Sequence, residues 1–351
     1  MNKSKIEYCN HTWNPITGCR HNCSYCYAKT MSFRFSGDVR LNKMAKADYT
    51  LCDAADGGDK IYVLDKPMLN ETGKNLIYPF GFEPTYHRYR MNMLGKLKMG
   101  NNIFVGAMAD LFGEWVPESI VNEILEACLA HPEHNYLFLT KNPNGYVTHP
   151  VPTEGHSNMF YGVSVTREAE IVERINGLPV QGKKFISIEP LLEDINPQNY
   201  VEYIKCLDWV IIGAETGRRS GKIIPQFEWI KKIVLIADTY GIPVFMKDSL
   251  IDIVGKKNMR REYPKELMKK TVSKKLEKRW FDKCCGCKSY LKKNEMITLF
   301  AKSKREEGPK RFGFMCKDCF KKLCERLELD IPPLGELPDD STGSLKDDKN
   351  G

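Results

Sequence analysis

Three cysteines near the N-terminus are spaced for metal chemistry. Cys19, Cys23 and Cys26 form a C-x3-C-x2-C pattern on a segment that begins with Gly18. Thiolate is the ligand that iron–sulfur clusters prefer, and three thiolates this close can all reach one small cluster. A fourth local cysteine would complete an electron carrier or a structural zinc site, whereas three leave one iron able to bind a substrate. A zinc site or an inert cluster is the alternative interpretation.

A second cysteine group lies near the C-terminus. Cys284 and Cys287, then Cys316 and Cys319, form two C-x2-C pairs separated by 28 residues. Each pair directs two thiolates at one point, which is typical of tetrahedral Zn²⁺. The residues between the pairs predict a β-hairpin, and a helix is expected from about Lys317, a combination that resembles a treble-clef zinc finger. A second iron–sulfur cluster is the alternative.

Charge is distributed unevenly along the 351 residues, whose formal net charge is +8. Residues 1–255 carry a net charge of −2, residues 256–326 carry +15 and residues 327–351 carry −5. A basic stretch of this kind binds polyanions, and aromatic side chains within it can stack on unpaired bases. We therefore expect a nucleic acid partner. The alternative is a solvated lysine-rich linker followed by a purely structural finger.

The apolar residues indicate a cytoplasmic protein. No run of about 18 apolar residues is long enough to span a bilayer, and the first residues lack the apolar run of a signal peptide. We therefore expect no membrane association. Disulfides are rare in a reducing compartment, so the spacing of the 13 cysteines is interpreted as metal chemistry.

Alternating strand and helix patterns predict an α/β fold. The short apolar runs are residues 103–106, 136–139, 160–163, 184–188, 209–213 and 243–246. The amphipathic stretches between them include residues 117–130, 167–175 and 227–240. Continuous apolar strands that alternate with helices imply a parallel sheet covered by helices. Six such units predict a complete or partial (β/α) barrel, and a doubly wound open sheet is the alternative.

Polar residues follow the predicted strands at the end where a barrel places its reactive groups. These residues are Asp110, Lys141, Ser164, Glu189, Glu215 and Lys247. We expect them to line a polar pocket. Asp110, Lys141, Glu189 and Lys247 are the candidate catalytic residues. For each of them a helix cap or an interior salt bridge is the alternative.

The first cysteine motif also carries a family resemblance. With Tyr25 directly before the last cysteine, it resembles the signature of the radical S-adenosylmethionine superfamily. The flanking Trp13-Asn14-Pro15 and Cys26-Tyr27-Ala28, together with Glu189-Pro190-Leu191-Leu192 and similar short motifs, resemble a phage-associated family of radical-SAM-like proteins. The resemblance covers roughly residues 6–250 and matches the predicted partial barrel.

The resemblance implies roles for the matched residues. Cys19, Cys23 and Cys26 would hold a 4Fe-4S cluster whose open iron binds S-adenosylmethionine. The other implied cofactor-binding residues are Tyr25 against the adenine, the Gly106 to Asp110 region near the methionyl amine, Ser164, and Gly213 and Glu215 near the adenine. A low-potential donor such as flavodoxin or ferredoxin would supply one electron, and the resulting 5′-deoxyadenosyl radical would take hydrogen from a substrate.

We expect four parts in the chain. They are a radical-SAM-like barrel at 1–255, a basic linker at 256–283, a small α+β zinc module with four cysteine ligands at 284–329 and a disordered acidic tail at 330–351. The leading hypothesis is a radical S-adenosylmethionine enzyme that modifies or repairs a nucleic acid. One alternative is an enzyme of the same cofactor class that acts on a protein or small molecule, with the finger docking a partner protein. Another is a non-enzymatic nucleic-acid-binding protein with structural metal sites.

Overall fold

The computed structural model describes residues 2–97, 100–268, 281–283, 290–292, 296–301 and 310–326. The chain divides into two compact units, Met1–Lys274 and Lys275–Gly351. Among the described residues, no helix is both long enough and apolar enough to cross a membrane.

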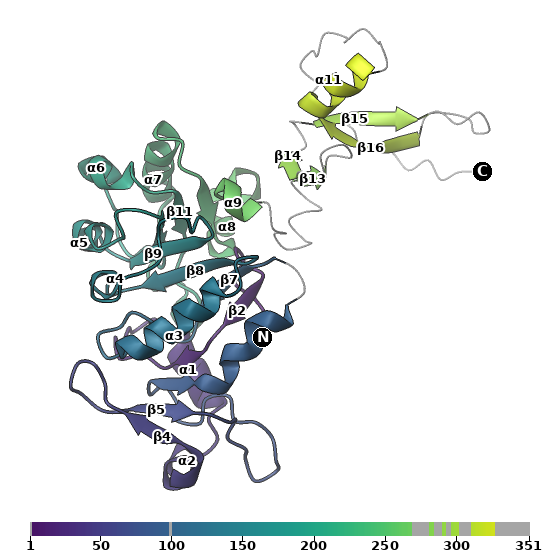
Figure 1. Ribbon diagram of the computed structural model, residues 1–351. Helices are drawn as coiled ribbons and strands as arrows, with labels where there is room; N and C mark the ends of the chain where they lie inside the picture. Colours follow the sequence, from purple (N-terminus) through teal and green to yellow (C-terminus); the bar gives the residue numbers. More distant parts are fainter. Residues whose placement is uncertain are drawn as a thin grey trace, which may run out of the picture. The chain divides into compact units, whose positions relative to one another are not determined.

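An eight-stranded sheet forms the centre of the first unit (Figure 1). Its spatial order is β1 (Asn2–Lys3), β2 (His11–Trp13), β7 (Asn102–Val105), β8 (Asn135–Thr140), β9 (Met159–Val165), β10 (Lys183–Ile188), β11 (Trp209–Ile212) and β12 (Val244–Met246). β1 pairs antiparallel with β2, and every other pairing is parallel. Spatial order follows chain order, so the sheet is a singly wound half-barrel. The partial-barrel prediction is confirmed, and the doubly wound alternative is wrong.

Helices follow the strands and cover one face of the sheet. They are α3 (Glu118–Leu129), α4 (Gly145–Thr148), α5 (Ile171–Asn176), α6 (Val201–Ile204), α7 (Phe227–Thr239) and α8 (Ile251–Val254). The last helix, α9 (Lys265–Met268), instead contributes Leu267 to the cluster on the opposite face. Single 3-10 turns at 168–170, 197–200, 217–219, 248–250 and 256–258 complete the connections. Ile124 of α3 and Ile233 of α7 belong to the same apolar cluster as Phe138 and Ile212 of the sheet. This cluster is the outer core of the half-barrel.

The inner face of the sheet changes from apolar to polar along the strands. Its apolar part includes Phe104, Leu137, Phe160, Phe185, Trp209 and Phe245, which pack with Tyr8, Tyr263 and Leu267. Gly162 leaves room for the Phe185 ring, because a Cβ at Gly162 would lie 2.3 Å from Phe185 Cζ. Side chains alternate along a strand, so the next inner positions are Lys141, Ser164, Ser187, Glu189, Gly213 and Lys247. The polar groups therefore gather at the carboxyl end of the half-barrel.

The half-barrel unit extends beyond residue 255. Tyr263 and Leu267 are buried in the inner cluster, and Trp209 Nε1 donates to the carbonyl of Glu262 at 2.9 Å. Residues 256–268 therefore pack on the half-barrel unit, although the charge pattern predicted that they form part of a linker.

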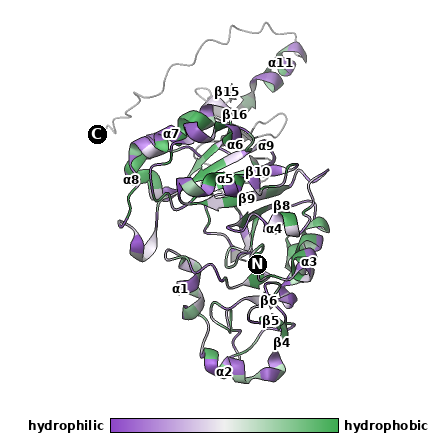
Figure 2. Ribbon diagram, turned by 90° about the vertical axis from the view of Figure 1, so that its left-hand side faces the viewer, coloured by the Kyte–Doolittle hydropathy of each residue, from purple (hydrophilic) through white to green (hydrophobic). Residues whose placement is uncertain are grey.

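Residues between β2 and β7 form a second, four-stranded sheet. Its order is β3 (Ile16–Thr17), β6 (Thr85–His87), β5 (Ile61–Leu64) and β4 (Thr50–Cys52). The helical elements of this segment are α1 (Tyr27–Arg34), α2 (Val39–Met44) and 3-10 turns at 46–48 and 88–96. In Figure 2, α1 and α2 carry both hydrophobic and hydrophilic residues. The cysteine loop lies between β3 and α1.

The second unit contains the hairpin and the helix that the sequence predicts. β13 (Phe281–Lys283) pairs antiparallel with β14 (Tyr290–Lys292), and β15 (Met296–Ala301) pairs antiparallel with β16 (Lys310–Cys316). Helix α11 (Lys317–Arg326) follows directly. Cys284 and Cys287 lie outside the described residues, so zinc binding by these two, Cys316 and Cys319 stays a prediction. The expected acidic tail at 330–351 also lies outside them.

Candidate functional site

The turn after β7 holds the cysteine loop in place. Gly18 N donates to the carbonyl of Met108 at 2.9 Å, and Tyr27 Oη donates to the carbonyl of Ala107 at 3.1 Å. Cys26 caps α1, since its Sγ accepts from Lys29 N at 3.4 Å. Both ends of the loop are therefore fixed to the carboxyl end of the half-barrel.

Cys19, Cys23 and Cys26 are free, half-buried thiols. Burial raises the pKa of the Cys19 thiol, and Asp110 and the other two cysteines raise it further. The three sulfurs therefore interact electrostatically, and three thiolates here would need nearby positive charge. Iron supplies that charge, so the donor set fits an iron–sulfur cluster.

The described residues include no group of three His, Cys, Asp or Glu side chains placed for a single metal ion. A cluster of several irons takes one thiolate per iron, so its ligands do not converge on one point.

Asp110 connects the cysteine loop to β8. Its carboxylate accepts hydrogen bonds from Thr140 Oγ1 at 2.7 Å, Lys141 N at 2.8 Å and Phe112 N at 3.1 Å. His21 Nε2 lies 2.7 Å from Asp110 Oδ2. These contacts occupy both oxygens of a side chain that is almost completely buried. This arrangement favours a positioning role for Asp110 over the catalytic role considered from its sequence position.

Lys141 lies between the cysteine loop and β9. Its Nζ donates to Tyr25 Oη at 2.7 Å and to Ser164 Oγ at 3.0 Å, and it lies 5.1 Å from the centre of the Tyr25 ring. Burial raises the pKa of the Tyr25 hydroxyl, while the Lys141 charge opposes that shift. Among the described residues no carboxylate pairs with the Lys141 ammonium, so this half-buried charge can bind an anionic group.

Glu189 and Lys247 form an ion pair across β11. They follow β10 and β12, and Gly213 follows the strand between them. A Cβ at Gly213 would lie 3.1 Å from Glu189 Cγ and 3.2 Å from Lys247 Cδ. The absence of a side chain at Gly213 therefore lets the two charged residues meet inside the half-barrel.

Two buried polar atoms, one on β10 and one in the segment that follows β11, have no hydrogen-bond partner within the described part of the chain. One oxygen of Glu215 pairs with Arg219, whereas Glu215 Oε2 is unpartnered. Ser187 Oγ, on the inner face of β10, is unpartnered as well. Unpaired buried polar atoms are costly, so these two positions fit contacts to a polar ligand.

The predicted site residues fall into separate contact groups. Tyr25, Lys141 and Ser164 form one, and Glu189, Gly213 and Lys247 form another. Asp110 contacts the cysteine loop through His21, and Glu215 contacts Arg219. Gly106, with φ of +75°, begins the turn that supports the loop.

The contact between His21 and Asp110 was not predicted from the sequence. His21 Nε2 reaches Asp110, and the centre of the His21 ring lies 5.1 Å from that of Trp115 in an edge-on contact. No spacing rule connects residues 21 and 110. The position of His21 inside the cysteine motif was the only available signal.

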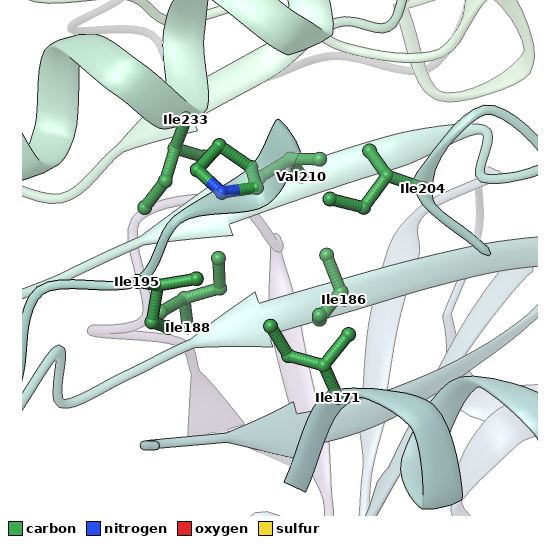
Figure 3. A pocket seen from close by; sticks show the side chains of 8 residues that line it. Ile171, Ile186, Ile188, Ile195, Ile204, Val210 and Ile233 are labelled. Carbon is green, nitrogen blue, oxygen red and sulfur yellow. The ribbon is translucent and has the colours of Figure 1, made fainter. Parts of the chain in front are cut away.

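A separate apolar cavity lies between the sheet and the helices (Figure 3). Its lining includes Ile186 and Ile188 of β10, Val210 of β11 and Ile233 of α7. These strand residues point to the outer face, opposite Ser187 and Glu189. The cavity has no polar lining group and is a packing feature of the core.

Fold and site together define an α/β half-barrel protein with a three-cysteine loop at the carboxyl end of its strands. The chain belongs to the family described as "Protein of unknown function (DUF5131)", which matches residues 3–284. No curated protein matches the chain.

Solved structures with a distant likeness are those of spore photoproduct lyase. A cysteine-to-alanine mutant with dinucleoside spore photoproduct has 10% identity and a TM-score of 0.38, over 93% of this chain and 73% of that chain. A double mutant of the same enzyme with bound AdoMet and dinucleoside spore photoproduct has 10% identity, the same coverages and a TM-score of 0.37. The likeness is too distant to assign a ligand or an activity.

Proposed function

We propose that this protein is a radical S-adenosylmethionine enzyme that modifies or repairs a nucleic acid. The observation that carries the proposal is the loop of Cys19, Cys23 and Cys26, fixed at the polar carboxyl end of a parallel half-barrel. A 4Fe-4S cluster bound there would supply the electron that cleaves S-adenosylmethionine. The half-barrel would exclude water and hold the substrate near the point of cleavage.

Lys141 and Ser164 are the residues best placed to bind the carboxylate of S-adenosylmethionine. The ammonium has no competing acid among the described residues, and Ser164 Oγ lies 3.0 Å from it. Tyr25 presents its ring beside the same ammonium, so an adenine or methionyl group can pack there. Glu215 Oε2 would accept a hydrogen bond from a hydroxyl or amino group of the ligand.

Glu189 and Lys247 would then face the substrate. A carboxylate beside an ammonium offers an acceptor and a donor at adjacent points. The pair would orient a polar substrate group. The net charge of +15 over residues 256–326 supports nucleic acid as the substrate class, with the C-terminal module as a further contact for it.

Cluster assembly tests the proposal. The protein is purified without oxygen and reconstituted with iron and sulfide, and bound iron and the absorption spectrum are measured. Cys19→Ala, Cys23→Ala and Cys26→Ala should each lose most of the bound cluster, because each removes one of three ligands. Cys52→Ala and Cys206→Ala are the matched controls, since both remove a free cysteine outside the loop. Full iron content in the loop variants would contradict the proposal.

A further inference from the structure

Large apolar side chains are exposed on the two helices that follow the cysteine loop. The exposed fractions are 55% for Tyr27, 41% for Met31, 46% for Phe35, 55% for Leu41 and 75% for Met44. Tyr27 and Met31 are spaced by four residues and lie on one face of α1, and Phe35 is the residue that caps the C-terminal end of the helix. Together these five side chains are the α1–α2 face.

Phe33 is exposed as well, but packing explains its position. A Cβ at Gly81 would lie 2.8 Å from Phe33 Cε1, so the Phe33 ring rests on the glycine backbone. All five side chains of the α1–α2 face are exposed, and large exposed apolar side chains gathered in one short segment point to an interaction site.

The same segment is basic. Residues 27–46 contain five basic residues and one acidic residue, whereas residues 1–255 as a whole carry a net charge of −2. The acidic residue, Asp38, caps α2 by accepting from Arg40 N. Lys43 pairs with Glu83. The other four cations are exposed and form no ion pair within the described part of the chain; they are Lys29, Arg34, Arg40 and Lys46. The segment that carries the exposed apolar side chains therefore also carries surplus positive charge.

This composition fits a protein partner better than a nucleic acid. Protein interfaces are enriched in aromatic residues, Met and Arg and depleted of acidic residues. A single-stranded nucleic acid would contact the cations and stack on the rings, but it would leave Met31, Leu41 and Met44 uncovered. The partner that fits has acidic residues around an apolar centre.

The α1–α2 face begins next to a proposed cluster ligand. Tyr27 follows Cys26, whose Sγ caps α1. We propose that the α1–α2 face docks the acidic, low-potential electron-donor protein that reduces the cluster. This inference rests on the proposed function. The donor would lose one electron and a cluster held by the three cysteines would gain it. A flavodoxin donor would go from the anionic hydroquinone to the neutral semiquinone, so no proton moves and no other bond changes.

Direct binding of flavodoxin to the cluster-loaded protein tests the proposal. Met31→Glu and Phe35→Glu place negative charge on the exposed face, which should repel an acidic partner. Each should weaken flavodoxin binding at least tenfold, measured by biolayer interferometry at low salt. Ile224→Glu is the matched control, because Ile224 is also an exposed apolar residue, 63% accessible, outside this segment. The control should bind like the parent protein.

Reduction rates separate this inference from the proposed function. Met31→Glu and Phe35→Glu should slow cluster reduction by flavodoxin tenfold or more and leave reduction by dithionite unchanged. Equal flavodoxin binding in all variants, or no binding by the parent protein, would overturn the docking proposal but would not contradict the proposed cluster. Loss of single-stranded nucleic acid binding or of self-association in these variants, with flavodoxin binding unaffected, would also overturn it. Failure to form a cluster would instead refute the proposed function.

Discussion

Asp110 is the residue whose contacts connect the cysteine loop with the barrel. Asp110→Asn replaces an oxygen acceptor with an NH₂ donor, so at least one of Thr140 Oγ1, Lys141 N and Phe112 N loses its acceptor. Because these groups are buried or nearly so, we expect the free energy of unfolding to fall by about 2 kcal/mol. Urea unfolding of the purified protein measures this change.

The comparison for this variant is Asp53→Asn. Asp53 forms an ion pair with Lys60 at 2.9 Å, but its side chain is 88% exposed. Stability should therefore stay within about 0.5 kcal/mol of the parent protein. An equal loss in both variants would show that the Asp110 network does not stabilise the loop.

His87 should make stability depend on pH. Complete burial and the nearby Arg90 lower the pKa of His87 well below its ordinary value. The unfolded chain then binds more protons than the native protein below a pH of about 6.5, so stability falls as the pH decreases through that range. Between pH of about 7.5 and about 5.5, this one group should cost about 1.4 kcal/mol.

The variant His87→Gln isolates the contribution of this residue. Glutamine keeps a hydrogen-bonding group near Thr17, whose Oγ1 lies 2.8 Å from His87 Nε2, but it does not titrate. His149, whose pKa burial also lowers, titrates in both proteins and cancels in the comparison. Urea unfolding at the two pH values should show a smaller decrease for the variant. The same decrease in both proteins would contradict the assignment to His87.

At the residue scale, the predictions rest on local spacing. The cysteine spacing in residues 19–26 predicts a shared metal site, and the polar residues after the strands predict a polar pocket; both stay predictions. The contacts of Asp110 with His21 and of Lys141 with Tyr25 join residues 89 and 116 positions apart. Contacts over that separation depend on how the loop packs, which no local pattern determines.

At the scale of an element, the conformation of the cysteine loop depends on Gly18. Its φ is +84°, and a Cβ would lie 2.3 Å from the carbonyl oxygen of Glu83. Gly18→Ala therefore forces the β3–α1 loop away from its neighbour. We expect a loss of stability well above the roughly 1 kcal/mol of left-handed strain alone, together with reduced iron incorporation.

Gly57→Ala is the control for left-handed strain without a collision. Gly57 has φ of +70° and no atom within 4 Å of an added Cβ. It should lose about 1 kcal/mol and keep the iron content of the parent protein. Equal iron content in the Gly18 and Gly57 variants would show that close packing at Gly18 does not determine the loop.

The long strands and helices were predictable because their periodicity is strong. The apolar runs became β7 to β12, and the stretches at 117–130 and 227–240 became α3 and α7. Three strands of the second sheet could not be predicted. β3, β4 and β6 have two or three residues each, which is too short for alternation to be recognised.

At the scale of the whole molecule, the basic stretch should bind nucleic acid through its charge. Replacing Lys302, Lys304 and Arg305 with serine removes three positive charges. Fluorescence anisotropy with a labelled single strand should show weaker binding and a salt dependence reduced by about 0.7 per lost phosphate contact. Lys231→Ser with Lys232→Ser is the control, because both lysines lie in α7 of the other unit. Identical salt dependence in all proteins would contradict a nucleic-acid role for this stretch.

The central claim concerns the reaction that the cysteine loop supports. The most direct measurement is the formation of 5′-deoxyadenosine by the anaerobically reconstituted, dithionite-reduced protein with S-adenosylmethionine, with and without single-stranded nucleic acid. We predict that the parent protein forms 5′-deoxyadenosine and that Cys23→Ala does not. A fully loaded cluster that yields no 5′-deoxyadenosine under either condition would contradict the assignment as a radical S-adenosylmethionine enzyme.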